Sequence, residues 1–571
     1  MSWTRRDFLW TSSGALVGFS LGACGREAGA DVTVLRNGIV LPVDVPFSQH
    51  SALAIQGGVV LALGSDDEVL LAAGPGARVI DLDGRTVLPG FIEPHMHFAL
   101  MAGLGHLRDI GPFQRPTFDD ALDAIAEIRE EAARTGPDEW VMGRQFDPIL
   151  LEPPRDLTTR DVDPIVPDRP AFFLNASGHI AYVNSRTLEL AGVDRSSTPP
   201  EGADYGRYED GELNGVIFGQ AAFLPILLRN ATVVDRMENG FAEAGIGVGQ
   251  QAAALGVTTL CDMATGGLAG ADELGLYRQM YADGRMKARI RAYVYDPAGA
   301  TFEEAGIRPG DGDAFARVSG WKIVSDGSNQ GFTGRQREPY LGSESLGLYY
   351  VEPDALRARV ADLAGRGWPL AIHANGDAAI DSVLDAVEAA AASGVDVRAL
   401  RCRIEHCSIL HDDQIARMQE HGMVPSFLIN HVHYWGHVMR DEVFGPEKVQ
   451  LLDRCASVER AGLNWVMHTD APVSPLGPLH KIRVAVARDL WKEPGTILAP
   501  DERVGVEAAI RAVTRNAAWA AHDEDELGSL EPGKRADFVI LEDDPRAVEP
   551  TAISDIVVSQ TWMDGKPVFG G

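Results

Sequence analysis

The amino-acid sequence predicts an α/β protein in which a (β/α)8 barrel is combined with a small β-sandwich built from both chain ends. Three observations support this prediction. Strand-like and helix-like segments alternate through the middle of the chain, short β-type runs occupy residues 31–88 and 527–569, and ligand-type side chains stand at the ends of several central strands. Such alternation is typical of a parallel sheet covered by helices.

Eight central segments have the apolar, strand-like composition of a buried parallel sheet. The first ends at His95, and the others are expected at residues 257–262, 289–295, 320–326, 369–373, 401–406, 424–429 and 463–470. Helix-like runs such as 353–367 and 378–393 separate most of them. Eight is the strand number of a (β/α)8 barrel, whose functional side chains lie at the carboxyl ends of its strands.

The two ends of the chain have a different pattern, in which short β-type runs are separated by hairpin-turn dipeptides such as Asn37-Gly38 and Asp564-Gly565. We therefore predict that residues 24–88 and 521–571 form one β-sandwich, with a barrel domain over residues 89–520 between them.

Residues from about 104 to 250 are more than a strand-to-strand connection needs. This stretch contains an expected helix at 117–135, which opens with a Thr-x-x-Asp capping pattern. We predict that it is an insertion covering the mouth of the barrel, because long functional loops often form substrate pockets.

Composition restricts the partners of the protein. The 571 residues include 51 Lys and Arg against 82 Asp and Glu, a formal net charge of −31, which disfavours nucleic acids and anionic membrane surfaces. Cys261, Cys402, Cys407 and Cys455 show no C-x-x-C spacing, so a structural zinc site or redox motif is not indicated. Buried free thiols are expected instead.

The N-terminal residues have the features of an export signal. Thr4-Arg5-Arg6-Asp7-Phe8-Leu9 matches a twin-arginine motif, and the apolar stretch at 8–21 is too short to span a bilayer. Leu21-Gly22-Ala23-Cys24 resembles a lipobox. We therefore expect a signal peptide over residues 1–23, a periplasmic or cell-surface location, and membrane attachment through a lipid on Cys24 alone.

Histidines, a lysine and an aspartate mark the strand ends. In an extended chain alternate side chains point the same way, so the first two histidines of the set face one point. Imidazole and carboxylate groups suit zinc and similar divalent metals. A metal centre at the barrel mouth is therefore predicted from six residues: His95, His97, Lys322, His373, His406 and Asp470.

The segments around these residues resemble amidohydrolase family 3, which includes N-substituted formamide deformylases and D-aminoacylase-like enzymes. They read Pro-Gly-Phe-Ile, Lys-Ile-Val-Ser-Asp-Gly, His-Ala-Asn-Gly-Asp, Ile-Glu-His, Thr-Asp-Ala-Pro and Gly-Lys-Arg-Ala-Asp, and they extend over nearly the whole chain after the signal peptide. Glu93-Pro94 departs from the Asp-small pair that is more common before the first histidine. The resemblance implies a metal-binding barrel with a composite β-sandwich.

The same resemblance implies the roles of the site residues. His95, His97 and Asp470 would hold one divalent metal, His373 and His406 a second, and Lys322 would bridge two zinc ions as an N-carboxylated lysine. A bridging water with its pKa lowered to about 7 would supply the attacking hydroxide. Asp470 would accept its proton and deliver it to the leaving nitrogen.

Four further residues are candidates for substrate contact. His179 lies in the predicted insertion and matches a family position thought to approach the substrate. His431, His433 and Trp435 follow the seventh predicted strand and are expected near the barrel mouth.

The sequence thus predicts a metal-dependent hydrolase that cleaves a non-peptide C–N bond of a small amide, formamide or acyl-amine. Two alternatives stay open. One is a cyclic amidine deaminase of the same superfamily, against which Lys322 argues, because such enzymes generally work with one metal and no bridging lysine. The other is a non-catalytic exported lipoprotein that binds a ligand or metal.

Overall fold

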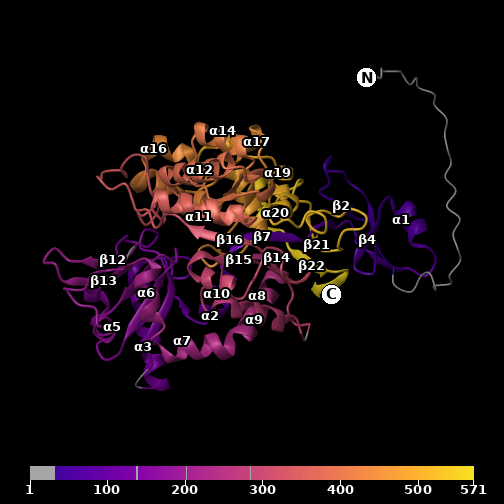
Figure 1. The fold of residues 1–571 in the computed structure, drawn as a ribbon. Helices are drawn as coiled ribbons and strands as arrows, with labels where there is room; N and C mark the ends of the chain where they lie inside the picture. The colour runs from indigo at the N-terminus through magenta and orange to yellow at the C-terminus, as the bar shows by residue number, and fades with distance from the viewer. Residues whose placement is uncertain (1–31, 137–138, 201, 283) are drawn as a thin grey trace, which may run out of the picture.

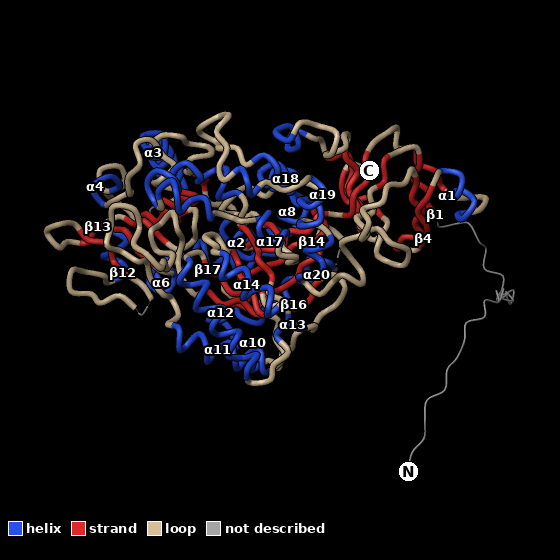
Figure 2. The backbone as a smooth tube through the Cα atoms, turned by 90° about the horizontal axis from the view of Figure 1, so that it is seen from above, coloured by secondary structure: helices blue, strands red, loops and turns tan. Residues whose placement is uncertain are grey.

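The computed structural model describes residues 32–136, 139–200, 202–282 and 284–571, so the predicted export signal and Cys24 lie outside the described residues. The centre of the molecule is an eight-stranded parallel sheet that curls into a nearly closed barrel (Figures 1 and 2). In sheet order its strands are β7 (Phe91–Met96), β14 (Val257–Thr265), β15 (Arg289–Tyr295), β16 (Ala316–Val324), β17 (Leu370–Ala374), β18 (Arg403–His406), β19 (Val424–Phe427) and β20 (Val466–Met467). The predicted barrel is therefore confirmed.

Helices cover the outside of the barrel. Pro353 occupies the first position of α11 (Pro353–Gly365), where its missing N–H costs no hydrogen bond. The following helix, α12 (Asp377–Ala392), buries Ile380, Val383 and Val387 against the barrel. Other covering helices are α8 (Phe241–Ala254), α9 (Glu273–Tyr281), α14 (Asp412–His421), α17 (Cys455–Arg460), α18 (Pro478–Ala487), α19 (Val506–Ala512) and α20 (Arg515–Ala520).

Both chain ends build the β-sandwich, as predicted. One sheet is formed by β1 (Val32–Arg36), β3 (Ala52–Gln56), β4 (Val59–Gly64) and β5 (Arg78–Asp81). The other is formed by β2 (Ile39–Val40), β6 (Thr86–Pro89), β21 (Phe538–Leu541), β22 (Val558–Met563) and β23 (Lys566–Phe569). Leu35, Leu53, Phe538 and Trp562 belong to one shared buried cluster, so residues about 500 positions apart in the chain complete the same core.

An ion-pair cluster joins this sandwich to the barrel. Arg289, fully buried at the start of β15, donates from Nε to Asp537 Oδ2 at 3.1 Å and from Nη2 to Asp564 Oδ1 at 2.7 Å. A buried arginine is tolerated when its donors are paired in this way. The C-terminal strands are therefore fastened to the barrel at the end opposite the carboxyl ends of its strands.

The chain between β7 and β14 forms a sheet of its own. Its strands, in sheet order, are β12 (Asp204–Arg207), β13 (Leu213–Phe218), β11 (Ile180–Val183), β10 (Ala171–Asn175), β9 (Val141–Phe146) and β8 (Arg108–Asp109). The flanking helix α3 (Phe118–Thr135) starts at a capping box, in which Thr117 Oγ1 accepts from Asp120 N and Asp120 Oδ2 accepts from Thr117 N, each at 3.1 Å. This sheet and the sandwich lie at opposite ends of the molecule (Figures 1 and 2).

The four cysteines of the described chain are free and buried, which confirms that prediction. Among the described helices, none is both long enough and apolar enough to cross a membrane.

Asp147, one residue beyond β9, is a buried acid whose partners are neutral. It accepts from Trp435 Nε1 at 2.8 Å and from Ile149 N at 3.3 Å, and burial raises its pKa to about 6. Because the folded state then holds a proton that the unfolded chain has released, stability falls as the pH rises from about 4 to 6. The ionised side chain costs about 3 kcal/mol above this range.

We expect Asp147→Asn to raise the free energy of unfolding at pH 8 by up to about 3 kcal/mol, since asparagine still accepts from Trp435 without carrying a charge. At pH 4 the wild type is protonated here as well, so the two proteins should be equally stable. Urea unfolding at both pH values measures the difference. An effect of the same size at pH 4 would contradict this account.

Candidate functional site

The site begins at the carboxyl end of β7. His95 is fully buried and His97, which follows the strand, keeps 24% of its side chain exposed. The Nε2 atoms of both rings lie 3.1 Å from one atom, Oδ1 of Asp470. The two histidines therefore face a single point, as their alternate spacing predicts.

Asp470 approaches them from the segment after β20. Its Oδ1 is buried and lies near both rings without forming a hydrogen bond to either. Burial by itself raises the pKa of Asp470, but His95 and His97 outweigh this and hold the pKa well below its ordinary value. The residue has a left-handed φ of 56°. Such backbone is uncommon outside glycine and gathers at functional sites.

His373 and His406 close the neighbouring strands β17 and β18. Their ring centroids are 4.4 Å apart, and His406 Nδ1 lies 3.9 Å from Asp470 Oδ2. The Nδ1 atom of His406 is buried without a hydrogen-bond partner, and the residue has a φ of 68°. Burial, reinforced by the adjacent His373, lowers the pKa of His406 well below its ordinary value. A neutral ring with a free nitrogen is suited to binding a metal.

Lys322 enters the same space from β16. Its side chain is buried, and its Nζ lies 3.2 Å from His95 Nε2. Burial lowers its pKa to about 8. All six residues predicted from the strand ends are therefore brought together around the carboxyl ends of β7, β16, β17, β18 and β20.

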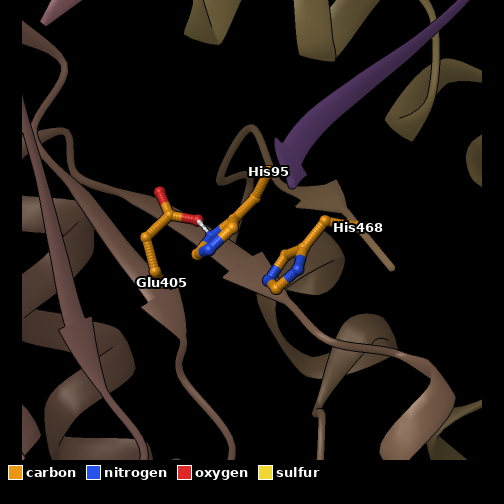
Figure 3. Close-up of side chains that lie close together, drawn as sticks. All are labelled: His95, Glu405 and His468. Carbon is orange, nitrogen blue, oxygen red and sulfur yellow. Dashed lines mark hydrogen bonds and ion pairs between the residues drawn. The ribbon is translucent and has the colours of Figure 1, made fainter. Parts of the chain in front are cut away.

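The orientation of His95 is set by an acid that the sequence analysis did not single out. Glu405 Oε2 accepts from His95 Nδ1 at 2.7 Å, while His468 stacks on the other side of the ring with centroids 4.4 Å apart (Figure 3). Burial opposes ionisation of Glu405, but Arg403 and His95 hold its pKa far below the usual range. With Nδ1 donating to a carboxylate, His95 turns the lone pair of Nε2 toward Asp470 and Lys322.

A second buried pair that was not predicted links the first and last strands of the barrel through Glu93. Lys481 Nζ donates to Glu93 Oε2 at 2.7 Å, and both side chains are fully buried. Glu93 Oε1 also accepts from Thr469 N at 3.0 Å, directly before Asp470. Glu93, noted in the sequence as a departure from the usual pattern, thus joins β7 to the segment that carries Asp470.

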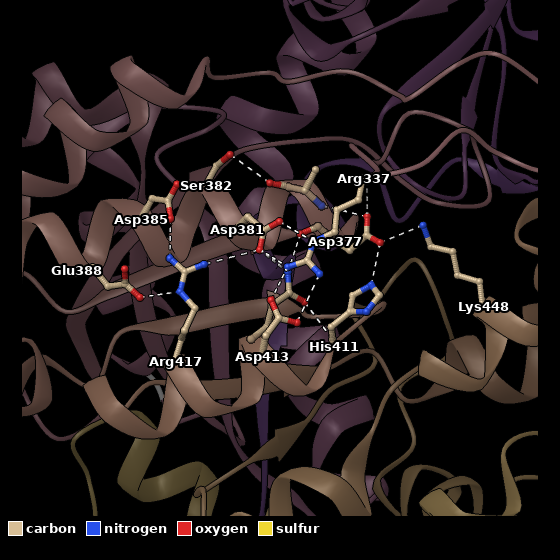
Figure 4. A network of polar contacts seen from close by, with 12 residues as sticks. Arg337, Asp377, Asp381, Ser382, Asp385, Glu388, His411, Asp413, Arg417 and Lys448 are labelled. Atoms are coloured by element: carbon tan, nitrogen blue, oxygen red, sulfur yellow. Dashed lines mark hydrogen bonds and ion pairs between the residues drawn. The ribbon is translucent and has the colours of Figure 1, made fainter.

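The acid at the end of β16 organises the loop over His373. Asp326 accepts from the backbone of Asn375 at 3.0 Å and of Gly376 at 2.9 Å, and its Oδ1 lies 3.3 Å from His373 Nε2. The segment that follows β16 is fastened to α12 and α14 by Arg337, which binds Asp381 and Asp413 (Figure 4). The backbone around His373 is therefore held on both sides.

These groups open onto a cavity of about 1090 Å³, counting the part open to solvent. His97, Lys322, His373, His406 and Asp470 line it, and so does His179 from the loop between β10 and β11. The His179 ring lies 5.4 Å from that of His373, and burial lowers its pKa to about 3, so it is neutral.

The other three candidates for substrate contact lie in a π-helical turn, η4 (His431–Trp435), after β19. His431 Nδ1 is 3.3 Å from Ser408 Oγ, His433 Nδ1 donates to the carbonyl of Asp489 at 2.7 Å, and Trp435 donates to Asp147. None of the three is among the described residues that line the cavity. Their contact with a substrate stays a prediction.

The chain is similar to known proteins over most of its length. The sequence model of the amidohydrolase family matches residues 78–569. An N-substituted formamide deformylase of Arthrobacter pascens is 28% identical over 546 residues, which cover 93% of this chain and 97% of that protein. The putative amidohydrolase YtcJ of Bacillus subtilis (strain 168) is 26% identical over 542 residues, covering 91% and 96%.

Two solved structures superpose on most of the chain. An uncharacterized metal-dependent hydrolase from Pyrococcus furiosus superposes with a TM-score of 0.67 at 25% identity, over 90% of this chain and 100% of that one. A second, from Pyrococcus horikoshii, superposes with a TM-score of 0.69 at 22% identity, over 91% and 99%, and supports the fold.

Proposed function

This chain belongs to the amidohydrolase family, and we propose on that premise that it is a metal-dependent hydrolase of the C–N bond in an amide, formamide or related acyl-amine. The observation that carries the proposal is the convergence of four histidines, a lysine and an aspartate, of which all but His95 line one cavity. The similarity to an N-substituted formamide deformylase over nearly its whole length supports the choice of bond.

The residues present fit a divalent metal. Asp470 Oδ1 and His406 Nδ1 are buried without hydrogen-bond partners, an arrangement that costs free energy unless another ligand satisfies them. His95, His97 and Asp470 would hold one ion and His373 and His406 a second, with Lys322 as an N-carboxylated bridge. A metal bound there acidifies water and polarises a substrate carbonyl.

The protein's own groups supply the proton transfer. Asp470 is ionised and faces the cavity, so it can accept the proton of the attacking water and pass it to the leaving nitrogen. His179, neutral and close to His373, would donate a hydrogen bond to the substrate. Glu405 keeps His95 in the required tautomer throughout.

The test is a substrate panel on purified protein loaded with zinc or manganese. We expect release of the free amine from N-formyl and N-acyl amines, loss of this activity after chelation, and recovery when the metal is restored. Release of ammonia from cyclic amidines, with no amine released from the amides, would support a deaminase instead. Metal binding without turnover of any amide would contradict the proposal.

A further inference from the structure

We propose that the substrate carries an uncharged, apolar substituent next to the bond that is cleaved, and that N-acyl amino acids are discriminated against. The proposal rests on the proposed function and adds a substrate class to that function. It follows from the walls of the cavity beyond the metal-binding residues, a space that we call the apolar chamber.

The apolar chamber is walled by side chains from the barrel and from the inserted sheet. α2 (Phe98–Leu104) directly follows His97, and α6 (Gln220–Leu227) faces it from the insertion. Six apolar residues form these walls. Two come from α2, two from α6, one from β14 and one from the loop after β14: Leu100, Leu104, Phe223, Leu227, Met263 and Leu268. A ligand group in contact with these walls gains about 25 cal/mol for each Å² of apolar surface that it buries.

The apolar walls of the chamber offer a carboxylate no cationic side chain. Among the described residues that line the cavity, Lys322 and Asp470 carry the formal charges, and both stand at the metal-binding end. The remaining polar lining groups are histidines, amides and hydroxyls, such as Gln145 and Tyr295. A carboxylate held among the apolar walls, away from the metal-binding end, has no cationic partner there and costs several kcal/mol, and the net charge of −31 opposes its entry further.

A hydrogen bond lies where the chamber adjoins a second pocket. Tyr295 donates from its hydroxyl to Gln220 Oε1 at 2.6 Å, and Gln220 Nε2 donates to the carbonyl of Gly178 at 3.2 Å. Both residues also line a second pocket, together with Pro225 and Leu228, and His179, Leu224 and Val324 are likewise common to the two spaces. The Tyr295–Gln220 pair therefore lies where the two spaces adjoin, and a compact group such as a phenyl ring fits the first one without breaking this hydrogen bond.

The test compares two substrates that differ by one carboxylate, N-formyl-2-phenylethylamine and N-formylphenylalanine, with the metal-loaded enzyme. We expect kcat/KM to be at least about 100-fold lower for the carboxylate, a ratio that an unpaired buried charge readily produces. Equal or faster hydrolysis of N-formylphenylalanine would overturn the inference.

Charge variants make the test specific to the chamber. Leu100 and Leu224 are half-buried lining residues, so Leu100→Arg and Leu224→Arg add a cation without burying it fully. Each should reduce the preference for the uncharged amide at least about tenfold. Leu190→Arg, 47% exposed on α5 (Ser185–Ala191) and away from the cavity, should leave it unchanged. A preference that no chamber variant alters would contradict the assignment.

Binding separates this inference from the proposed function. Calorimetric titration of both amides into the metal-loaded Asp470→Asn protein measures affinity without turnover. Tighter binding of the uncharged amide would support the apolar chamber even if the wild type hydrolysed neither compound, an outcome that would count against the proposed function alone. Tighter binding of N-formylphenylalanine would overturn the chamber assignment.

Discussion

Replacing Asp470 by asparagine is expected to lower kcat by about 100- to 10,000-fold, the range that a positioned proton-transfer group contributes. Asparagine keeps the shape of the side chain and tolerates the left-handed backbone at φ 56°, so the fold should be retained. It loses the ionised oxygen that lies 3.1 Å from both His95 Nε2 and His97 Nε2. Steady-state amine release measures the effect, and elemental analysis shows whether metal is lost as well.

Asp453 provides a matched control for this substitution. It is also a buried aspartate with a left-handed φ, 46°, but it lies outside the residues described as lining the cavity. Asp453→Asn makes the same replacement at a buried aspartate outside the cavity and should leave kcat unchanged. If Asp470→Asn kept more than about a tenth of the wild-type kcat at full metal content, Asp470 would not be the proton-transfer group.

The barrel could be predicted from the sequence because the features that indicate it lie within single short segments of the chain. Each buried strand is short and apolar, and His373 and His406 stand within one residue of their strand ends, so strand composition and site residues point to the same edge of the sheet. The helix that begins after Thr117 could be predicted for the same reason, since its capping residues, Thr117 and Asp120, are only three positions apart.

The supporting pairs could not be predicted, because their partners are hundreds of residues apart. His95 and Glu405 are separated by 310 positions, and Glu93 and Lys481 by 388. Separations of this length have no relation to the helix or strand periods from which local structure is predicted. One signal was present nonetheless: Glu405 stands in a strand whose residues are all buried, and a buried carboxylate requires a charged or hydrogen-bonding partner.

Backbone irregularities explain the remaining differences. The strand expected over 463–470 pairs only at Val466–Met467, because Thr469 N is directed to Glu93 and Asp470 takes a left-handed conformation. After β19 the chain forms the π-helical turn η4, so His433 points to Asp489. Turns of this kind depend on tertiary contacts and leave no repeating pattern in the sequence.

Lys322 is expected to determine how much metal the protein retains. Protein produced with bicarbonate present should contain about two divalent ions per chain, and Lys322→Ala should contain about one or fewer, because the variant has no side chain to bridge the two sites. Amine release should fall in parallel. Elemental analysis measures the first effect, and circular dichroism shows whether the variant has folded. Lys448→Ala is the control, since Lys448 pairs with Asp377 rather than lining the cavity.

Chemical rescue distinguishes a carbamate from an ammonium at this position. Lys322 Nζ lies 3.2 Å from His95 Nε2 in a buried space, so its removal leaves room for a small guest. If the lysine acts as an N-carboxylated bridge, acetate or propionate should restore part of the metal content and activity of Lys322→Ala, because a carboxylate supplies the same two oxygens. If it acts as an ammonium, methylamine should rescue the variant and acetate should not. Equal metal content in wild type and variant would make Lys322 a packing residue and would favour hydrolysis at a single metal held by His95, His97 and Asp470.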